Sequence, residues 1–325
     1  MPRVVTLSAV VPLFDELENL PALHRRLSDS LTALGIEYEL VFVNDGSSDG
    51  TPELLDQLAE DDPRVRPIHL SRNFGHQAAV TAGLEFATGD AVVVLDGDLQ
   101  DPPEVIGLLL ERWREGVDVV YAVRTKRKEG RFKRFGYFAF YRLLRGISEL
   151  EIPLDSGDFC LMDRQVVDTL NALPERSRFV RGLRTFVGFR QIGVSYERDA
   201  RFAGQPKYTF RKLVALAQEG VVNFSTAPMR AMSWCAGVGV MAALGIGCWM
   251  IVDAAVNHAA PAGWLVAILV ACALAALQLG CLAVMGVYLL QIFREVKGRP
   301  TYIVRGARPT RESRTARPRS LALAR

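Results

Sequence analysis

Residues 92–104 read VVVLDGDLQDPPE, and this stretch decides the fold. An apolar run typical of a buried strand ends at Leu95, and two carboxylates, Asp96 and Asp98, follow one residue apart. Open α/β sheets bind ligands outside the carboxyl ends of their strands. Carboxylates there are hard oxygen ligands of the kind that hold Mg²⁺ or Mn²⁺ together with substrate phosphates. The stretch therefore indicates a metal and phosphate site at a sheet edge. The alternative is that it forms an ordinary solvated turn.

Strand-like and helix-like segments alternate in the N-terminal half of the chain. The predicted strands are β-branched runs over 4–11, 38–43, 65–70 and 91–95. The predicted helices lie between them, over 19–34, 51–60 and 74–87. This alternation predicts βαβ units and a largely parallel sheet that helices cover on both faces. Thr51 and Asp101 each precede a proline, which predicts that their side chains cap the helices that follow.

Two further predicted strands also end in polar residues. Residues 41–51 read VFVNDGSSDGT and supply Asp45, while residues 70–76 read LSRNFGH and supply Arg72. Each could alternatively be an ordinary turn whose side chains cap the next helix. Three polar strand ends at one sheet edge describe a nucleotide site better than three coincidental turns do.

The C-terminal third is apolar enough to cross a membrane. Between Ala231 and Phe293 the only formally charged residue is Asp253, which we expect to reach the headgroups. About 20 helical residues span the hydrocarbon layer, so 232–256 and 264–293 each suffice, with a tight turn over 257–263. Arginine flanks the two predicted spans and is absent from the turn, which places both ends of the hairpin in the cytosol.

The segments around this hairpin predict a four-part organisation. An amphipathic pattern over 210–224 indicates a juxtamembrane helix, and the aromatic-rich stretch 135–144 could lie on a membrane surface. From Arg294 onward the chain holds ten basic and two acidic residues, a tail that suits anionic lipid headgroups rather than nucleic acid. We therefore expect a cytosolic α/β domain over 1–209, a juxtamembrane helix over 210–230, two transmembrane helices within 231–293 and a basic cytosolic tail over 294–325.

Composition and cysteine usage exclude several classes of protein. With 50% hydrophobic residues, 23% charged residues and a net charge of +3, the 325-residue chain is neither disordered nor collagen-like. Its five cysteines form no CxxC pair, so neither a disulfide framework nor a zinc site is indicated, and Cys160 is expected to be a small buried apolar residue. The first eleven residues lack the pattern of a signal peptide, which favours a cytosolic globular part.

Taken together, four motifs resemble those of the family 2 glycosyltransferases with the GT-A fold: VPLFDE at 11–16, NDGSSD at 44–49, RNFG at 72–75 and DGDLQDPPE at 96–104. The nearest subgroup is similar to dolichol-phosphate mannose synthase and to the bacterial undecaprenyl-phosphate glucosyl and aminoarabinosyl transferases. The resemblance covers roughly residues 4–299, including the hairpin. It implies an inverting, metal-dependent transfer of a sugar from a nucleoside diphosphate to a polyprenyl phosphate, at the cytosolic face of a bacterial inner membrane.

The resemblance also implies roles for individual residues of the donor site. It makes Asp98 a metal ligand and Asp96 a ribose or metal-water contact. Asp45 would contact the base or ribose. The remaining residues implied at the nucleotide or metal are Pro12, Asp15, Glu16, Arg72 and Gln100.

Three further stretches resemble the acceptor and catalytic parts of the family. Arg124 in YAVR matches an arginine that meets the acceptor phosphate, and Arg131, Lys133 or Arg134 lies where the family has its acceptor loop. DSGDF at 155–159 makes Asp158 the proposed catalytic residue, as a base or as a positioning group. RFAGQPKY at 201–208 places Arg201 and Lys207 near the transferred phosphates, with Pro206 where the family usually has serine.

Two rival functions remain open at this point. A processive polysaccharide synthase shares the fold and the Asp-X-Asp pattern, but it typically carries Gln-x-x-Arg-Trp, which this chain lacks, and more spans. A catalytically silent membrane scaffold would not need the acidic and basic motif residues. Analogy favours a UDP-sugar donor, with GDP-mannose as the alternative. A homo-oligomer is one option for the oligomeric state.

Overall fold

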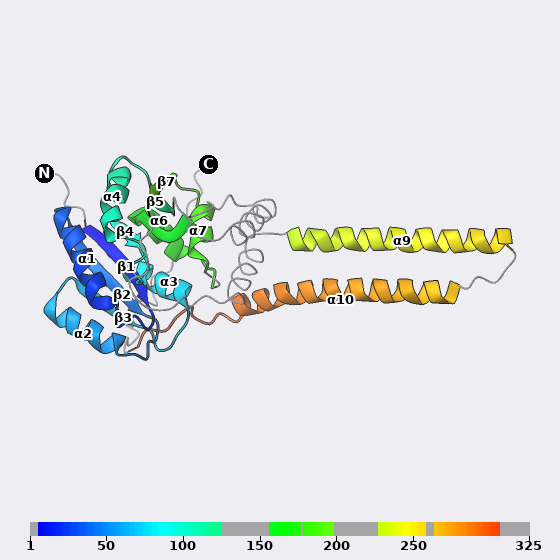
Figure 1. Ribbon diagram of the computed structural model, residues 1–325, viewed down its shortest axis with the longest axis horizontal. Helices are drawn as coiled ribbons and strands as arrows, with labels where there is room; N and C mark the ends of the chain where they lie inside the picture. Colours follow the sequence, from blue (N-terminus) through cyan, green and yellow to red (C-terminus); the bar gives the residue numbers. More distant parts are fainter. Residues whose placement is uncertain (1–5, 125–155, 177, 198–226, 258–262, 306–325) are drawn as a thin grey trace. The chain divides into compact units, whose positions relative to one another are not determined.

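The computed structural model describes residues 6–124, 156–176, 178–197, 227–257 and 263–305 (Figure 1). The chain forms two compact units. The first contains Met1–Gly136, Ile152–Lys207 and Arg299–Arg325, and the second contains Tyr137–Glu151 and Tyr208–Gly298.

The first unit is built on a seven-stranded sheet with the order β3-β2-β1-β4-β6-β5-β7. Its strands are β1 (Thr6–Leu13), β2 (Glu37–Asn44), β3 (Val65–His69), β4 (Ala91–Val94), β5 (Val119–Arg124), β6 (Ser156–Asp163) and β7 (Gln191–Tyr196). The helices are α1 (Leu20–Ala33), α2 (Thr51–Asp61), α3 (His76–Phe86), η1 (Pro103–Val105), α4 (Ile106–Arg114), α6 (Arg164–Ala172) and α7 (Val180–Phe186). The alternation of strands and helices predicted for residues 4–95 is confirmed.

Strands β1 to β4 run parallel, so their carboxyl ends meet at one edge of the sheet. Strand β6 is antiparallel to both of its neighbours, β4 and β5. Val94, the last residue of β4, pairs with Cys160 of β6. Two residues further on, toward that same edge, the chain after β4 reaches Asp96, and the β6 residue at the same level is Asp158. The sheet register therefore brings together two carboxylates that are far apart in the sequence.

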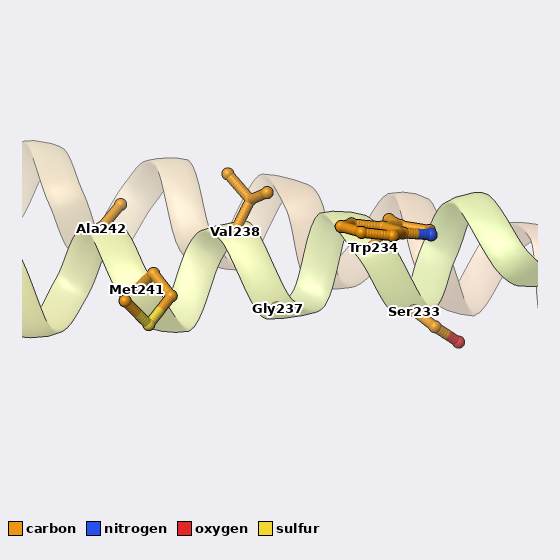
Figure 2. Close-up of a pocket in the computed structure, with 6 residues that line it drawn as sticks. All are labelled: Ser233, Trp234, Gly237, Val238, Met241 and Ala242. Atoms are coloured by element: carbon orange, nitrogen blue, oxygen red, sulfur yellow. The ribbon is translucent and has the colours of Figure 1, made fainter.

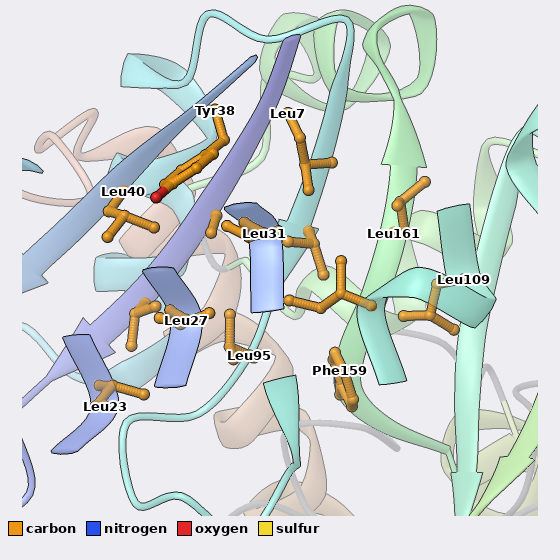
Figure 3. Close-up of a cluster of buried hydrophobic side chains, with 14 of the residues drawn as sticks. Leu7, Leu23, Leu27, Leu31, Tyr38, Leu40, Leu95, Leu109, Phe159 and Leu161 are labelled. Atoms are coloured by element: carbon orange, nitrogen blue, oxygen red, sulfur yellow. The ribbon is translucent and has the colours of Figure 1, made fainter. Parts of the chain in front are cut away.

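A leucine stripe on α1 covers one face of this sheet (Figure 3). Leu23, Leu27 and Leu31 follow one another at four-residue spacing and are fully buried, which places them on one face of the helix. They belong to a core that also contains Leu7 and Leu40 of the sheet. Burying side chains of this kind stabilises the fold by roughly 1.5–3 kcal/mol each.

Helix α3 lies against the opposite face of β1 and β2, and a glycine lets it approach closely. A Cβ atom at Gly83 would overlap the side chain of Val10 and would lie 3.2 Å from Val43. Ala79 and Val80 of the same helix are buried. The close approach fixes the start of α3, where His76 follows Gly75, relative to the carboxyl edge of the sheet.

The second unit contains two long apolar helices, α9 (Ala227–Asn257) and α10 (Gly263–Val296). By length and composition, Ala231–Trp249 and Ala273–Val296 could each cross a membrane, and neither stretch is buried inside the protein. Trp234, for example, is 76% exposed. Apolar helices whose apolar side chains face outward fit lipid rather than water, and the two helices predicted for 232–256 and 264–293 are present as candidate membrane spans.

Several predicted segments lie outside the described residues. These are the aromatic-rich stretch 135–144, the basic tail from 306 onward and residues 210–226 of the juxtamembrane helix predicted over 210–230. The last four residues of that predicted helix, 227–230, belong to α9. Residues 299–305, which we assigned to that tail, instead belong to the first unit, where Val304 pairs with Leu70.

Candidate functional site

The two predicted metal-binding carboxylates lie on the turn that follows β4. Gly97 stands between Asp96 and Asp98, and a Cβ atom there would lie 2.5 Å from the Leu13 side chain at the end of β1. Leu99 is buried and has a φ of 58°, a left-handed conformation that is uncommon for a residue other than glycine. The Oδ1 atom of Asp98 accepts a hydrogen bond of 3.2 Å from the backbone N–H of Gln100. The turn is therefore tightly packed and locally strained, as turns at functional sites often are.

Asp101 fixes the far side of this turn through a contact that the sequence did not predict. Its carboxylate accepts a short hydrogen bond from the hydroxyl of Tyr196, at the end of β7. The Tyr196 ring packs edge-on against Phe159, with ring centroids 5.7 Å apart. The predicted helix cap at Asp101 is wrong: the segment from Pro103 begins with a short 3₁₀ helix and has no side-chain cap. Asp101 instead ties the turn after β4 to β7, the last strand of the sheet.

The loop after β1 is joined to the loop after β2. Asp15, which has a φ of 49°, accepts a hydrogen bond of 2.9 Å from the backbone N–H of Ser48 and donates its own backbone N–H to Ser47. Glu16 donates its backbone N–H to the hydroxyl of Thr51. Thr51 is the first residue of α2 and does not cap it, so that prediction is also wrong. Its hydroxyl joins the two loops that we expect to border the nucleotide.

Asp45 is almost completely buried at the end of β2, where it holds the loop after β3. Its two carboxylate oxygens accept hydrogen bonds from the backbone N–H groups of Phe74 and Gly75, at 2.7 and 2.9 Å. Burial raises the pKa of Asp45, although the two backbone donors oppose this shift. Arg72 in the same loop is exposed and stacks on Phe74, with its guanidinium 4.3 Å from the ring centre. Whether Asp45 also contacts a base or ribose stays a prediction.

Asp158 lies at the centre of a charged cluster. One carboxylate oxygen is 3.1 Å from the Nε2 atom of His76 and 3.3 Å from the amide nitrogen of Gln77, and the other is 3.2 Å from the guanidinium of Arg181. His76 also lies 3.7 Å from Asp96. The cluster thus joins the start of β6, the start of α3 and helix α7 beside the turn after β4.

The charges in this cluster shift one another's protonation. Burial alone would raise the pKa of Asp158, but the positive charge of Arg181 and the hydrogen bond from His76 outweigh burial and hold that pKa well below its usual range. Burial would likewise lower the pKa of His76, but the hydrogen bond to Asp158 and the charge of Asp96 raise it to about 9. At neutral pH the pair is therefore a carboxylate and an imidazolium.

Asp96 has the opposite shift. Burial, which dominates, and the neighbouring carboxylates raise the pKa of Asp96 to about 6, while the charge of His76 opposes the shift. A carboxylate whose charge is poorly compensated is suited to bind a cation, which would favour the ionised form.

A buried arginine adds to the positive charge around Asp158. Arg184 is only 1% exposed, and its guanidinium lies 5.1 Å from the centre of the Tyr121 ring. Its charge also contributes to the low pKa of Asp158. A buried guanidinium of this kind needs negative charge nearby, and Asp158 supplies it.

The donor set fits a metal that is bound together with a substrate. Among the described residues there is no group of three or more His, Cys, Asp or Glu side chains that could hold a metal ion. Mg²⁺ in nucleotide sites is usually held by one or two carboxylates plus substrate phosphates and waters, rather than by a complete protein cage. Asp96 and Asp98, both partly exposed, match that arrangement.

The structure brings together only part of the predicted site. Asp96, Asp98 and Asp158 gather at the carboxyl edge of the sheet, beside the loops that carry Asp15 and Asp45. Pro12 is buried within β1, where it pairs with Val43. Arg124 ends β5 opposite Tyr196, and its side chain is not described. The other predicted basic residues, Arg131, Lys133, Arg134, Arg201 and Lys207, lie outside the described residues.

Sequence reasoning missed three members of the Asp158 cluster. His76 and Gln77 directly follow the RNFG motif, so the motif's position at a strand exit could have drawn attention to them. Arg181 lies 23 residues after Asp158 and in no motif that we recognised, so only the folded chain reveals it.

One apolar hollow among the described residues belongs to the second unit. It has a volume of about 720 Å³ and lies along α9, where it is lined by Ser233, Trp234, Gly237, Val238, Met241 and Ala242 (Figure 2). It is an open, apolar surface of one candidate membrane span, with none of the charged groups that phosphate chemistry needs. We therefore place the candidate site at the carboxyl edge of the sheet.

Comparison with known proteins identifies the family of the chain. Residues 8–170 match the model of the family described as "Glycosyl transferase family 2". An uncharacterized glycosyltransferase of Bacillus subtilis, YkcC, is 44% identical over 312 residues, which is 94% of each chain. The prophage bactoprenol glucosyl transferase homolog of Escherichia coli K12 is 40% identical, over 92% of this chain and 98% of its own. The bactoprenol glucosyl transferase of Shigella phage SfV is 41% identical over the same shares.

Both the family match and the relatives cover the motifs that form the site. The matched residues 8–170 include Asp45, Asp96, Asp98 and Asp158, and the relatives extend over nearly the whole chain. The sheet with its carboxylates after β4 has the architecture of the GT-A fold. The chain is a glycosyltransferase and belongs to glycosyl transferase family 2.

Proposed function

We propose that this protein transfers a sugar from a nucleoside diphosphate sugar to the phosphate of a membrane polyprenol. The observation that carries the proposal is the likeness to bactoprenol glucosyl transferases, at about 40% identity over 92% of the chain, which includes both α9 and α10. A lipid acceptor also gives a reason for the two exposed apolar helices, because it keeps one substrate in the membrane.

UDP-glucose is the donor that we favour, and GDP-mannose is the alternative. The word glucosyl in the relatives' names supports glucose. The base would lie near the joined loops after β1 and β2, where Asp15, Glu16 and Asp45 are found. We assign Arg72 and Gln100 to the rim of the same pocket.

Asp96 and Asp98 would hold a Mg²⁺ or Mn²⁺ ion together with the donor's phosphates. When bound, such an ion stabilises the negative charge that develops on the departing nucleoside diphosphate. The two carboxylates would hold this ion, and the strained turn at Leu99 fixes the direction in which the carboxylates point.

The acceptor phosphate needs orientation more than activation. One of its oxygens attacks the anomeric carbon while the bond from that carbon to the donor phosphate breaks, so the configuration inverts and the nucleoside diphosphate leaves. The attacking oxygen is already anionic at neutral pH, and no proton has to be removed. Basic side chains would hold the phosphates, since one guanidinium group can bind two phosphate oxygens at once. These side chains are Arg124, Arg131 or its neighbours Lys133 and Arg134, Arg201 and Lys207.

We assign Asp158 a positioning role. His76 and Arg181 already engage its two oxygens, and its pKa is held well below its usual range. Such a carboxylate accepts protons poorly, but it can orient cations that face the acceptor phosphate.

The reaction would take place at the cytosolic face of a bacterial plasma membrane, with both termini in the cytoplasm.

Transfer of radiolabelled glucose from UDP-glucose to undecaprenyl phosphate in nanodiscs tests the proposal. We expect a labelled lipid from which mild acid releases a single sugar, and no labelled lipid from the Asp98→Asn variant. A polymeric product would favour a processive synthase. Absence of transfer from UDP-glucose, other UDP-sugars and GDP-mannose would favour a silent scaffold.

A further inference from the structure

Residues 299–305 follow α10 in the sequence and belong to the first unit, which we call the catalytic unit. There they pair with the end of β3. We call this stretch the return segment. The backbone N–H of Ser71 donates to the carbonyl of Ile303 at 2.8 Å, and the N–H of Arg305 donates to the carbonyl of His69 at 2.7 Å. Between these two bonds, Leu70 and Val304 form an antiparallel bridge.

Two side chains extend the contact beyond this bridge. The hydroxyl of Tyr302 donates a short hydrogen bond to the carboxylate of Glu85 on α3. Burial and this hydrogen bond raise the pKa of the Tyr302 phenol, which therefore stays protonated as a donor. The hydroxyl of Thr301 lies 3.4 Å from the carbonyl oxygen of Arg176, between α6 and α7. The return segment thus contacts three separate parts of the catalytic unit.

The pairing is concentrated where the loop after β3 begins. Strand β3 is at the edge of the sheet, and exposed edges are often covered by another segment. A segment that only covered the edge would be expected to run along Val65–Ile68. Instead, the described hydrogen bonds join it to His69 and Ser71, at the carboxyl end of the strand and beside the candidate site.

The same loop is held from its other side by residues of the expected donor pocket. The backbone N–H of Leu70 donates to the carbonyl of Asn44 at 2.9 Å, and Asp45 accepts the N–H groups of Phe74 and Gly75. Gly46 packs so closely on the loop that a Cβ atom there would lie 2.5 Å from the backbone nitrogen of Asn73. Residues 70–75 therefore lie between the end of β2 and the return segment.

We infer that the return segment is a positioning element of the donor site. By fixing the backbone of His69–Ser71, it sets the path of the loop that Asp45 holds and that carries Arg72. This inference rests on the proposed function, because it assigns donor binding to this edge of the sheet. It makes the chain beyond the second membrane helix part of the machinery that binds the nucleotide sugar.

A matched pair of variants in the full-length protein separates the backbone contact from the side chain. Arg305→Pro removes the N–H that donates to His69, whereas Arg305→Ala keeps this N–H and removes the side chain beyond Cβ. Tyr302→Phe removes the hydroxyl that contacts Glu85 and changes little else. Each variant is compared with wild type in nanodiscs that contain undecaprenyl phosphate, with UDP-glucose as the donor.

We expect Arg305→Pro to raise the KM for UDP-glucose by about three- to tenfold, the effect of losing one hydrogen bond. The KM for undecaprenyl phosphate and kcat should stay within about twofold of wild type. Amide hydrogen exchange of residues 69–76 should become faster. Tyr302→Phe should shift the same quantities in the same direction, and Arg305→Ala should shift them much less than Arg305→Pro does.

Other outcomes overturn the inference. Unchanged exchange in residues 69–76 of Arg305→Pro would mean that the segment does not hold the loop. Faster exchange with an unchanged KM for the donor would leave the segment a purely structural role, and equal effects of Pro and Ala at position 305 would exclude the backbone contact. If wild type transfers no sugar, the proposed function fails on its own, and the exchange measurement still decides whether the segment orders the loop.

Discussion

The Nε2 atom of His76 lies 3.1 Å from a carboxylate oxygen of Asp158, although 82 positions separate the two residues in the sequence. The other oxygen of Asp158 faces Arg181 at 3.2 Å. A carboxylate between two cations is stabilised in its ionised form and has little tendency to take up a proton. The same contacts leave Asp158 well placed to orient positive groups beside the turn after β4.

The assignment of the metal can be tested with Asp98→Asn, which keeps the shape of the side chain and removes its charge. Metal ions contribute several kcal/mol of transition-state stabilisation, so we expect transfer to fall by about a hundredfold or more. Excess EDTA should stop the wild-type enzyme, and Mn²⁺ or Mg²⁺ should restore it. Asp61→Asn, an exposed carboxylate at the end of α2, serves as the control and should behave as wild type. Full activity after metal removal would refute the assignment.

Arg124→Ala and Arg201→Ala test the predicted contacts with the acceptor phosphate. A charge-assisted hydrogen bond contributes on the order of 1.5–3 kcal/mol, so transfer at limiting undecaprenyl phosphate should fall by about tenfold or more. The Mn²⁺ concentration that gives half-maximal activity should change much less. Arg114→Ala, on the exposed end of α4, is the matched control. A variant that turns over normally at limiting acceptor would show that its arginine only faces solvent.

Gly46→Ala and Gly35→Ala separate backbone strain from close packing. Both glycines have a left-handed backbone, with φ of 68° and 62°, which costs alanine about 1–2 kcal/mol. An alanine at position 35 would meet nothing within 4 Å, whereas one at position 46 would collide with the backbone of Arg72 and Asn73. Thermal unfolding should show a larger loss of stability for Gly46→Ala, and only that variant should raise the KM for UDP-glucose. Equal losses in the two variants would mean that the loop after β3 moves aside easily.

The sequence was sufficient to predict the first half of the sheet and the two apolar helices. Strands β1 to β4 each contain β-branched residues and alternate with helical patterns, and their parallel pairing follows from the helices between them. The antiparallel insertion of β6 between β4 and β5 has no such local signal. It depends on long-range pairing that propensity and periodicity do not report.

The candidate site was predictable only where a motif follows a strand. Asp96, Asp98 and Asp45 were found because each lies just beyond a β-branched run. Thr51 and Asp101 were misassigned as helix caps because the local pattern fits a cap, whereas each side chain forms a tertiary contact that outweighs it. Arg181 and Tyr302 could not be found, since their roles arise from contacts across the folded chain.

The membrane topology is testable with reporter fusions. Arg230 precedes the first span, Arg294, Lys297 and Arg299 follow the second, and residues 257–263 contain no Arg or Lys, which predicts cytosolic ends and an external turn. A reporter that works only in the cytosol should therefore be active when it is fused after Arg325. A reporter that works only outside the cytosol should be active when it is inserted at Gly263. A C-terminus on the outer face would contradict the hairpin.

Asp158→Asn distinguishes a general base from a positioning group through the pH dependence of its defect. The pKa of Asp158 is held well below its ordinary value of 3.8, so its charge is present above that value and would be lost only at a lower pH. Assays between about pH 5.5 and 8.5 therefore keep the wild-type carboxylate ionised throughout. The acceptor phosphate, in contrast, loses its second proton near pH 6.

If Asp158 were a base, it would matter most below about pH 6, where the phosphate still carries a proton, and a base contributes about 10² to 10⁴ in rate. The defect of Asp158→Asn would then shrink as the pH rises. Because His76 and Arg181 already engage Asp158, we expect instead a defect of at least about tenfold that is nearly the same at every pH. Asp168→Asn, on the exposed face of α6, is the control and should follow the wild-type profile. Wild-type turnover of Asp158→Asn across the whole range would exclude both roles.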